Sequence, residues 1–127
     1  MTIFQFADPA NLERIAAAGD DELNALDFGV IGFDRDGIVR RYNVFESRAS
    51  GMARERVIGA HLFTGVAPCM NNYMIAQRFE DAETAGIALD AEIDYVLTLK
   101  MRPTLVKLRM LSRPGQPLSY VLLHRKA

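Results

Sequence analysis

A run of alternating side chains in the C-terminal half constrains the fold of this chain more than any other feature. Six apolar residues share one face of an extended backbone: Ala91, Ile93, Tyr95, Leu97, Leu99 and Met101. Polar residues occupy the positions between them, with Val96 as the exception. Because successive side chains of a strand point to opposite faces, residues 90–101 are predicted to form a β-strand with one buried face.

Four further segments are predicted to complete one sheet. Segments 28–33 and 38–42 flank Asp36-Gly37, a dipeptide typical of hairpin turns. Segments 104–112 and 118–125 flank a turn that contains Pro114-Gly115. The order is two strands, a helical and irregular middle, and then three strands. This order predicts an α+β fold: a central five-stranded antiparallel sheet with helices on one face and an N-terminal helical cap on the other.

Helical signals occur in three places. Asp8-Pro9 and Asp20-Asp21 are typical of helix starts, and they predict two short helices in the cap. Residues 73–85 are predicted to form the main helix, which ends at Gly86. Residues 43–63 have no sustained period, so we expect short helical turns and loops. Segments of this kind commonly shape a ligand pocket.

The composition is that of an ordinary soluble domain, with 50% hydrophobic and 24% charged residues. A net charge of -1 gives no attraction to nucleic acid or anionic membranes, so neither is expected as a partner. A single cysteine excludes an internal disulfide, and no signal peptide or membrane-spanning run is present. We therefore expect a cytoplasmic protein with one domain over residues 1–127, with its cap at 1–26 and its core at 27–127.

Cys69, the only cysteine, follows Pro68 and precedes two asparagines that could cap a helix opening at Tyr73. The thiol is then expected beside the positive end of a helix dipole, where a thiolate is favoured. The alternative is a buried, inert cysteine, which is the commoner role for a lone cysteine. This stretch by itself favours the inert role.

Tyr42, Glu46 and Ser50 recur at helical spacing within an apolar neighbourhood, and with Cys69 they form the candidate site. A carboxyl group in such surroundings is protonated more readily, because desolvation penalises its anion. Neutral Glu46 could then donate a hydrogen bond. The alternative is a solvated loop glutamate, and spacing alone favours that alternative.

Other chemistry has weaker support. His61 and His124 are far apart in sequence, which argues against a zinc site. A Cys69–His61 nucleophile pair rests only on proximity in the sequence, so no enzyme is expected. The basic residues Lys107, Arg109 and Arg125 are interpreted as a solvated edge or face of the sheet.

Several segments resemble the photoactive yellow protein family, and the resemblance extends from about residue 20 to residue 125. They are residues 27–31, 36–37, 42–43, 46, 51, 57–59, 66–69, 101–104 and 106–107. The spacing from Tyr42 to Glu46 to Cys69 is reproduced without gaps. The family has the PAS fold, in agreement with the strand and helix order described above.

The resemblance implies a blue-light receptor that carries trans-p-coumaric acid (4-hydroxycinnamic acid) as a thioester. Cys69 matches the attachment residue, and Tyr42 and Glu46 match the groups that hold the phenolate. Ser50 stands where threonine usually supports the tyrosine. Met101 matches a methionine that assists return to the dark state, and Ala67 belongs to the matching pocket segment. The resemblance further implies an unknown downstream signalling protein as partner, and it leaves a homodimer open.

The chain also departs from the family pattern. Met52 stands where an arginine usually covers the chromophore, and Leu97 and Leu99 replace aromatic residues. These departures favour an alternative: a light-independent PAS sensor that binds haem or another small molecule, or that serves as an interaction module. An acyl-transferring cysteine enzyme has little support, because no base is expected beside Cys69.

Overall fold

Five strands form one antiparallel sheet in the order β2-β1-β5-β4-β3. The computed structural model describes residues 5–98 and 103–125. The strands are β1 (Gly29–Phe33), β2 (Val39–Tyr42), β3 (Leu89–Leu97), β4 (Thr104–Ser112) and β5 (Ser119–Arg125). The five-stranded antiparallel sheet predicted from the sequence is confirmed.

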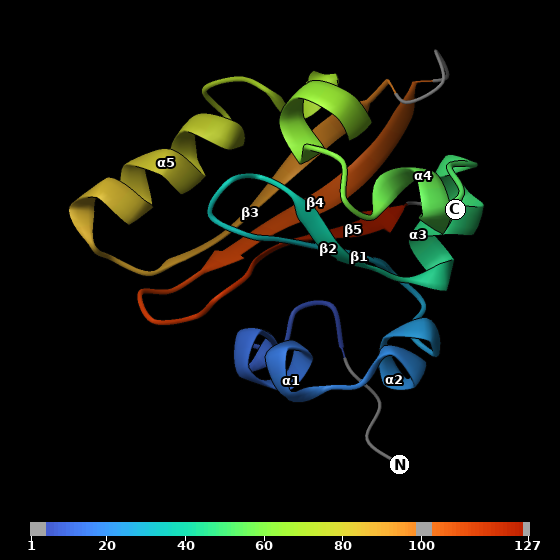
Figure 1. The fold of residues 1–127 in the computed structure, drawn as a ribbon, viewed down its shortest axis with the longest axis horizontal. Helices are drawn as coiled ribbons and strands as arrows, with labels where there is room; N and C mark the ends of the chain where they lie inside the picture. The colour runs from blue at the N-terminus through green and yellow to red at the C-terminus, as the bar shows by residue number, and fades with distance from the viewer. Residues whose placement is uncertain (1–4, 99–102, 126–127) are drawn as a thin grey trace.

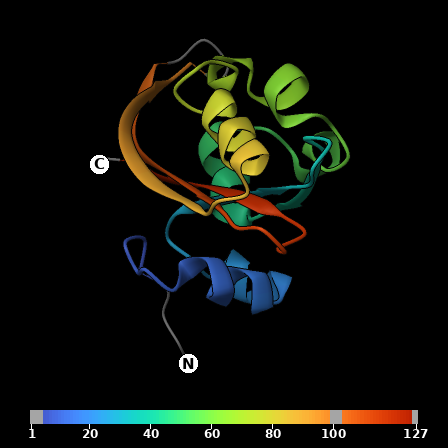
Figure 2. The same cartoon turned by 90° about the vertical axis from the view of Figure 1, so that its left-hand side faces the viewer.

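Helices cover the two faces of this sheet unequally. The cap consists of α1 (Asn11–Ala17) and α2 (Asp20–Asn24) on one face. The opposite face carries α3 (Val44–Ser50), α4 (Arg54–Val57), the π-helix η1 (Leu62–Val66), the 3-10 helix η2 (Pro68–Met70) and α5 (Ala76–Ala85). Figures 1 and 2 show the blue cap helices on one side of the curved sheet and the green and yellow helices on the other. The predicted placement of the helices is therefore confirmed.

The apolar and polar side chains of β3 alternate because one face of the strand is turned toward the core, as predicted. Leu89, Ala91, Ile93 and Tyr95 are partly buried, and Leu97 is fully buried, whereas the residues between them are exposed. β3 pairs with β4 along its whole length, from Leu89 opposite Ser112 to Leu97 opposite Thr104. Val106, Leu108 and Met110 of β4 lie in the same core cluster. The last part of the predicted strand, residues 99–101, lies outside the described residues.

Two arginines tie the N-terminal cap to the sheet through its main chain. Arg41 donates to the carbonyls of Ile15 and Ala18 at 2.8 and 2.7 Å. Arg109 donates to the carbonyls of Phe6 and Asp8, both at 2.8 Å. The interpretation of Arg109 as a solvated side chain is therefore wrong: only 4% of the residue is exposed. It is buried because the cap covers this part of β4 and supplies acceptors for its hydrogen bonds.

Local signals located the turns more accurately than the helix starts. Asp34 Oδ1 accepts from the amides of Asp36 and Ile38 in the predicted hairpin turn, where Gly37 has φ +82°. The main helix, however, begins at Ala76 rather than Tyr73. Asn72 Oδ1 does accept from the amides of Met74 and Ile75, as a capping side chain would. These bonds close a turn that precedes the helix.

Candidate functional site

Tyr42 lies at the end of β2, and its hydroxyl is surrounded by acceptors from α3 and the loop that follows. Its oxygen lies 2.7 Å from Ser50 Oγ. The main-chain carbonyls of Glu46 and Met52 lie 3.5 and 3.3 Å away. Ser50 Oγ also accepts from the amide of Met52 at 3.1 Å, so the serine hydroxyl proton is free to point toward Tyr42. The structure thus brings Tyr42 and Ser50 into direct contact.

Burial raises the pKa of Tyr42 to about 12, although the hydrogen bond with Ser50 opposes this shift. The phenol therefore stays protonated at neutral pH. A neutral phenol can accept from the Ser50 hydroxyl and donate its own proton to another acceptor.

Asn43 positions Glu46 at the first turn of α3. Its side-chain oxygen accepts from the amides of Glu46 and Val30 at 3.1 and 2.9 Å. Its side-chain nitrogen donates to the carbonyls of Leu23 and Phe28, both at 2.9 Å. Asn43 is only 1% exposed, and all these polar contacts are internal. One side chain therefore links the start of α3 to β1 and to α2 of the cap.

Glu46 is fully buried, and its carboxylate forms a two-pronged hydrogen bond with Arg125 at the end of β5. Arg125 Nη1 donates to Oε1 at 2.7 Å, and Nη2 donates to Oε2 at 2.9 Å. Figure 1 shows the red end of β5 reaching α3. The interpretation of Arg125 as a solvated residue is wrong, because only 15% of its side chain is exposed. Its position on β5 gives the reason: Arg125 lies on the same face of the strand as Val121 and Leu123, which belong to the core on that side.

The Glu46 carboxylate also depends on the absence of a side chain at Gly29 in β1. A Cβ atom at that position would lie 2.0 Å from Glu46 Oε1. Burial raises the pKa of Glu46, and its hydrogen bond and charge interaction with Arg125 oppose that shift. The same contact raises the pKa of Arg125 against the effect of its own burial. A bidentate pair of hydrogen bonds between a guanidinium and a carboxylate is among the strongest hydrogen-bonded contacts in proteins.

Cys69 lines a cavity of about 480 Å³ between the α3–α4 region and η1–η2. The described residues that line it are Gly51, Met52, Ala53, Arg56, Gly65, Val66, Pro68, Cys69 and Thr98. Arg56 carries the only formal charge in this set. Met52 is common to the cavity and the Tyr42 contacts, because it lines the cavity and its carbonyl lies 3.3 Å from Tyr42 Oη.

The main chain at Cys69 is held by β3. Tyr95 Oη donates to the Cys69 carbonyl at 2.5 Å, and Asn72 Nδ2 donates to Tyr95 Oη at 2.6 Å and to the same carbonyl at 3.2 Å. The thiol does not begin a long helix, contrary to the sequence interpretation. Cys69 sits in the single turn η2, which ends at Met70 before α5 begins at Ala76. The helix whose dipole was expected to act on the thiol therefore does not begin next to Cys69.

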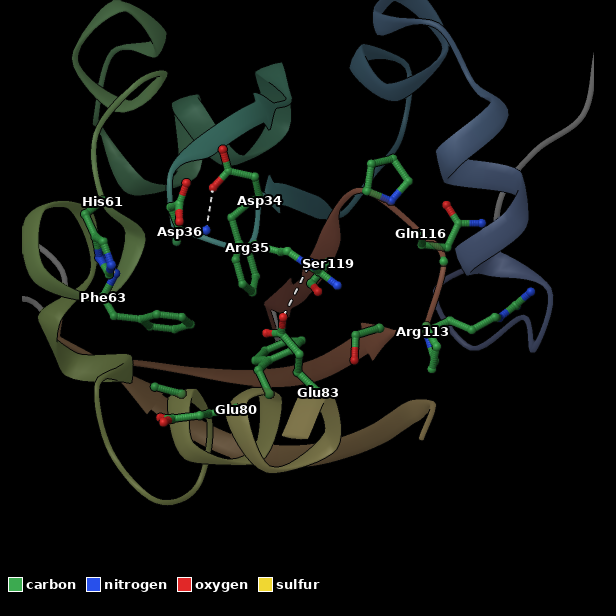
Figure 3. Close-up of a pocket in the computed structure, with 18 of the residues that line it drawn as sticks. Asp34, Arg35, Asp36, His61, Phe63, Glu80, Glu83, Arg113, Gln116 and Ser119 are labelled. Atoms are coloured by element: carbon green, nitrogen blue, oxygen red, sulfur yellow. Dashed lines mark hydrogen bonds and ion pairs between the residues drawn. The ribbon is translucent and has the colours of Figure 1, made fainter. Parts of the chain in front are cut away.

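A larger cavity of about 660 Å³ lies elsewhere, between the β1–β2 turn, α5 and the β4–β5 turn. Figure 3 shows Asp34, His61, Glu80 and Arg113 around it. None of the predicted site residues that the structure describes lines this cavity. His61 Nδ1 accepts from the amides of Phe63 and Thr64 at 3.1 and 3.2 Å. That nitrogen caps η1 and is not available as a base for Cys69.

Of the remaining predicted site residues, Ala67 is fully buried just before η2, and Met101 lies outside the described residues. Sequence reasoning missed the contacts of Arg125, Gly29 and Tyr95. Strand alternation could have indicated the face on which Arg125 lies, and a glycine within a strand is a known signal of close approach. Across residues 5–98 and 103–125, no cluster of three His, Cys, Asp or Glu side chains could hold a metal ion. No helix in the same part of the chain is long and apolar enough to cross a membrane.

Comparisons with known proteins agree on one family. A photoactive yellow protein from Halochromatium salexigens is 34% identical over 110 residues, which are 87% of each chain. The photoactive yellow protein domain of the sensor histidine kinase Ppr from Rhodospirillum centenum superposes with a TM-score of 0.81. It is 39% identical, and the match covers 89% of this chain and 98% of that domain.

The fold extends to more distant proteins. A PAS domain from Colwellia psychrerythraea has a TM-score of 0.63 at 11% identity, with 91% of this chain and 97% of that chain covered. This likeness shows the PAS fold alone. No protein-family model matches the chain.

Proposed function

The chain belongs to the photoactive yellow protein family, and from this premise we propose that it is a blue-light receptor with trans-p-coumaric acid bound as a thioester to Cys69. The observation that carries the proposal is a lone thiol lining a cavity that Met52 also lines, together with a buried, protonated tyrosine whose hydroxyl lies 3.3 Å from the Met52 carbonyl. Small-ligand sites are typically cavities with a few polar groups close by, which supports the proposal.

The residues present fit an anionic phenolic group. A phenolate needs strong donors to stay ionised away from water. Tyr42 is such a donor, because its pKa of about 12 keeps its proton in place at neutral pH. Arg56 adds a positive charge at the cavity where Met52 replaces the usual arginine. The acyl group of an activated p-coumaric acid would form a bond to Cys69 Sγ, and the thiol proton would depart with the leaving group.

The bound group would supply a double bond that light converts from trans to cis. The chain's own residues would then respond through protons and hydrogen bonds. Protonated Glu46 would donate a hydrogen bond to the phenolate in the dark and would pass that proton to the phenolate oxygen after illumination. Ionised Glu46 is costly in a fully buried position unless a positive charge accompanies it. Asn43 holds both the amide of Glu46 and the carbonyl of Leu23, so the change reaches the cap directly.

The partner is proposed to be a signalling protein that recognises the rearranged cap. One structural relative is a domain of a sensor histidine kinase, which supports a role in signal transduction. The cap is suited to this role because hydrogen bonds from only a few sheet side chains hold its main chain.

Reconstitution tests the proposal. Purified protein mixed with activated p-coumaric acid is expected to turn yellow, to gain the mass of one p-coumaroyl group and to bleach reversibly under blue light. Cys69→Ser should remain colourless and unmodified while retaining the circular dichroism of the wild type. A folded wild-type protein that stays colourless would overturn the proposal. Under that outcome, a Soret band after addition of haem would favour the light-independent PAS sensor.

A further inference from the structure

The pairing of Glu46 with Arg125 joins the proposed chromophore site to the last described residue of β5. Glu46 is fully buried, and both of its oxygens are engaged by one guanidinium at 2.7 and 2.9 Å. A glutamate whose oxygens both accept from arginine is a carboxylate. The proposed function, in contrast, requires a protonated glutamate that donates to a phenolate. Glu46 must therefore adopt two arrangements, one as a carboxylate paired with Arg125 and one as a protonated donor.

We propose that Arg125 is the exchangeable counter-ion of Glu46: it holds Glu46 ionised in the chromophore-free protein and leaves when Glu46 takes up a proton. This inference rests on the proposed function and adds a regulating residue to that site. One proton moves in the exchange. It passes from the incoming phenol or from water to the Glu46 carboxylate, and the guanidinium keeps its own charge and turns toward solvent.

Three observations support the exchange. Arg125 is partly exposed, with 15% of its side chain accessible, so it has a route to water. Among the described residues, the Arg125 guanidinium has no hydrogen bond or ion pair other than that with Glu46. The other ionisable group that interacts with Glu46 is Tyr42 of β2, which stays neutral with its raised pKa of about 12. Burial disfavours the ionised form of Glu46, and among the described residues Arg125 is the charged group that opposes this effect.

The same exchange would compensate the negative charge that Glu46 acquires after illumination. When Glu46 loses its proton in a buried position, an unpaired carboxylate would be strongly unfavourable. Arg125 can return and restore the ion pair. The bleached state would therefore be stabilised by a residue that contributes little in the dark state.

Infrared spectroscopy of the chromophore-free protein provides the decisive test. Difference spectra between wild type and Glu46→Gln, recorded across a pH series, isolate the Glu46 signal. We expect carboxylate bands from Glu46 at neutral pH. In Arg125→Met a protonated carboxyl band should replace them, and the Glu46 midpoint should rise by about one pH unit or more, a tenfold change in proton affinity. Arg35→Gln, which removes an exposed pair with Glu83, is the matched control.

The outcomes separate this inference from the proposed function. A protonated Glu46 in the wild type at neutral pH, or an unchanged midpoint in Arg125→Met, overturns the inference even if the protein turns yellow. If Arg125→Met does not fold, Arg125→Gln takes its place. In yellow protein, the same substitution should shorten the lifetime of the bleached state by about tenfold, the effect of losing one charge-assisted contact. A wild type that never turns yellow overturns the proposed function and leaves the infrared result to decide the inference.

Discussion

Two arginine–carboxylate pairs lie on opposite faces of the sheet, and they differ in which partner is buried. On the cap face, Arg109 is 5% exposed and Asp90 is 49% exposed. On the site face, Arg125 is 15% exposed and Glu46 is 1% exposed. An arginine cannot be deprotonated in a protein, so the buried charge of the first pair is permanent. A carboxylate can be neutralised by one proton, so the second pair can open.

The remaining contacts reinforce this difference. Arg109 directs Nε and Nη2 to the two oxygens of Asp90, each at 2.8 Å, and Nη1 to the carbonyls of Phe6 and Asp8. Among the described residues, the guanidinium of Arg125 forms hydrogen bonds only with Glu46. The first arginine is a fixed anchor of the cap, and the second is suited to exchange. The same pair of chemical groups thus serves stability on one face and the proposed switching on the other.

Removal of the fixed anchor should have the largest effect. Arg109→Met removes the charged donor to the carbonyls of Phe6 and Asp8, which keep only their hydrogen bonds from Asn11, and it removes a paired, buried charge. We expect a loss of about 3 kcal/mol in the free energy of unfolding, as for other broken buried pairs. Chemical denaturation measures the loss, and limited proteolysis should show faster cleavage near Phe6. Lys107→Met on the same strand, which removes an exposed pair with Asp94, should change neither result. Equal effects of the two substitutions would contradict an anchoring role.

Displacement of the exchangeable pair should have the next largest effect. Gly29→Ala places a Cβ atom 2.0 Å from Glu46 Oε1, so the carboxylate must move away from Arg125. Overpacking of this kind typically costs about 1–3 kcal/mol, and we expect about 2 kcal/mol here. Gly19→Ala is the matched control, because a Cβ atom there meets nothing within 4 Å. If Gly29→Ala preserves both the stability and the infrared signal of Glu46, the close approach has no functional consequence.

The pH dependence of stability should distinguish the two pairs. Burial raises the pKa of Glu46 above its ordinary value of 4.5, so the folded state binds a proton more tightly than the unfolded state does. This contribution to stability is fully present below the unfolded pKa and is lost as pH rises through the folded pKa. Arg125→Met should extend the loss to higher pH, with a slope of up to about 1.4 kcal/mol per pH unit.

Denaturation at several pH values measures this slope. Near pH 5 the Arg125→Met protein should be close to the wild type, and it should fall behind as the pH rises above neutrality. Arg109→Met should instead show a deficit that is similar at every pH in this range, because the hydrogen bonds that it removes from the carbonyls of Phe6 and Asp8 have main-chain acceptors that do not titrate. Parallel curves for Arg125→Met and the wild type would mean that Glu46 ionises without help from Arg125.

Much of the fold was predictable because local chemistry determined it. The alternation over residues 90–97 and the Asp36-Gly37 turn need only neighbouring residues to be interpreted. The two buried arginines were not predictable in the same way, because a charged side chain is usually exposed and its partner is distant in sequence. Glu46 and Arg125 are 79 residues apart. Strand periodicity could indicate the face of Arg125, but only the assembled sheet brings α3 beside the end of β5.

Within the site, we expect the smallest effect on stability from removal of the Ser50 hydroxyl, which contacts Tyr42. Ser50→Ala removes the 2.7 Å contact with Tyr42 Oη and the acceptor for the Met52 amide. A loss of about 1 kcal/mol is typical of such a change. The pKa of Tyr42 should rise further, because the Ser50 hydrogen bond now lowers it. Carbon-13 NMR of labelled tyrosine follows this titration directly.

Ser47→Ala is the matched control for this substitution. Ser47 lies on the same helix and donates to the Met52 carbonyl at 2.9 Å, but it has no contact with Tyr42. It should give a similar small loss of stability without moving the Tyr42 titration. The Glu46 infrared signal should be unchanged in both variants, because the Arg125 pair does not involve either serine. A Ser50→Ala protein in which Glu46 changes its ionisation would show that the tyrosine pair and the arginine pair are coupled, contrary to the expectation that the Ser50 hydroxyl does not affect the Glu46 proton.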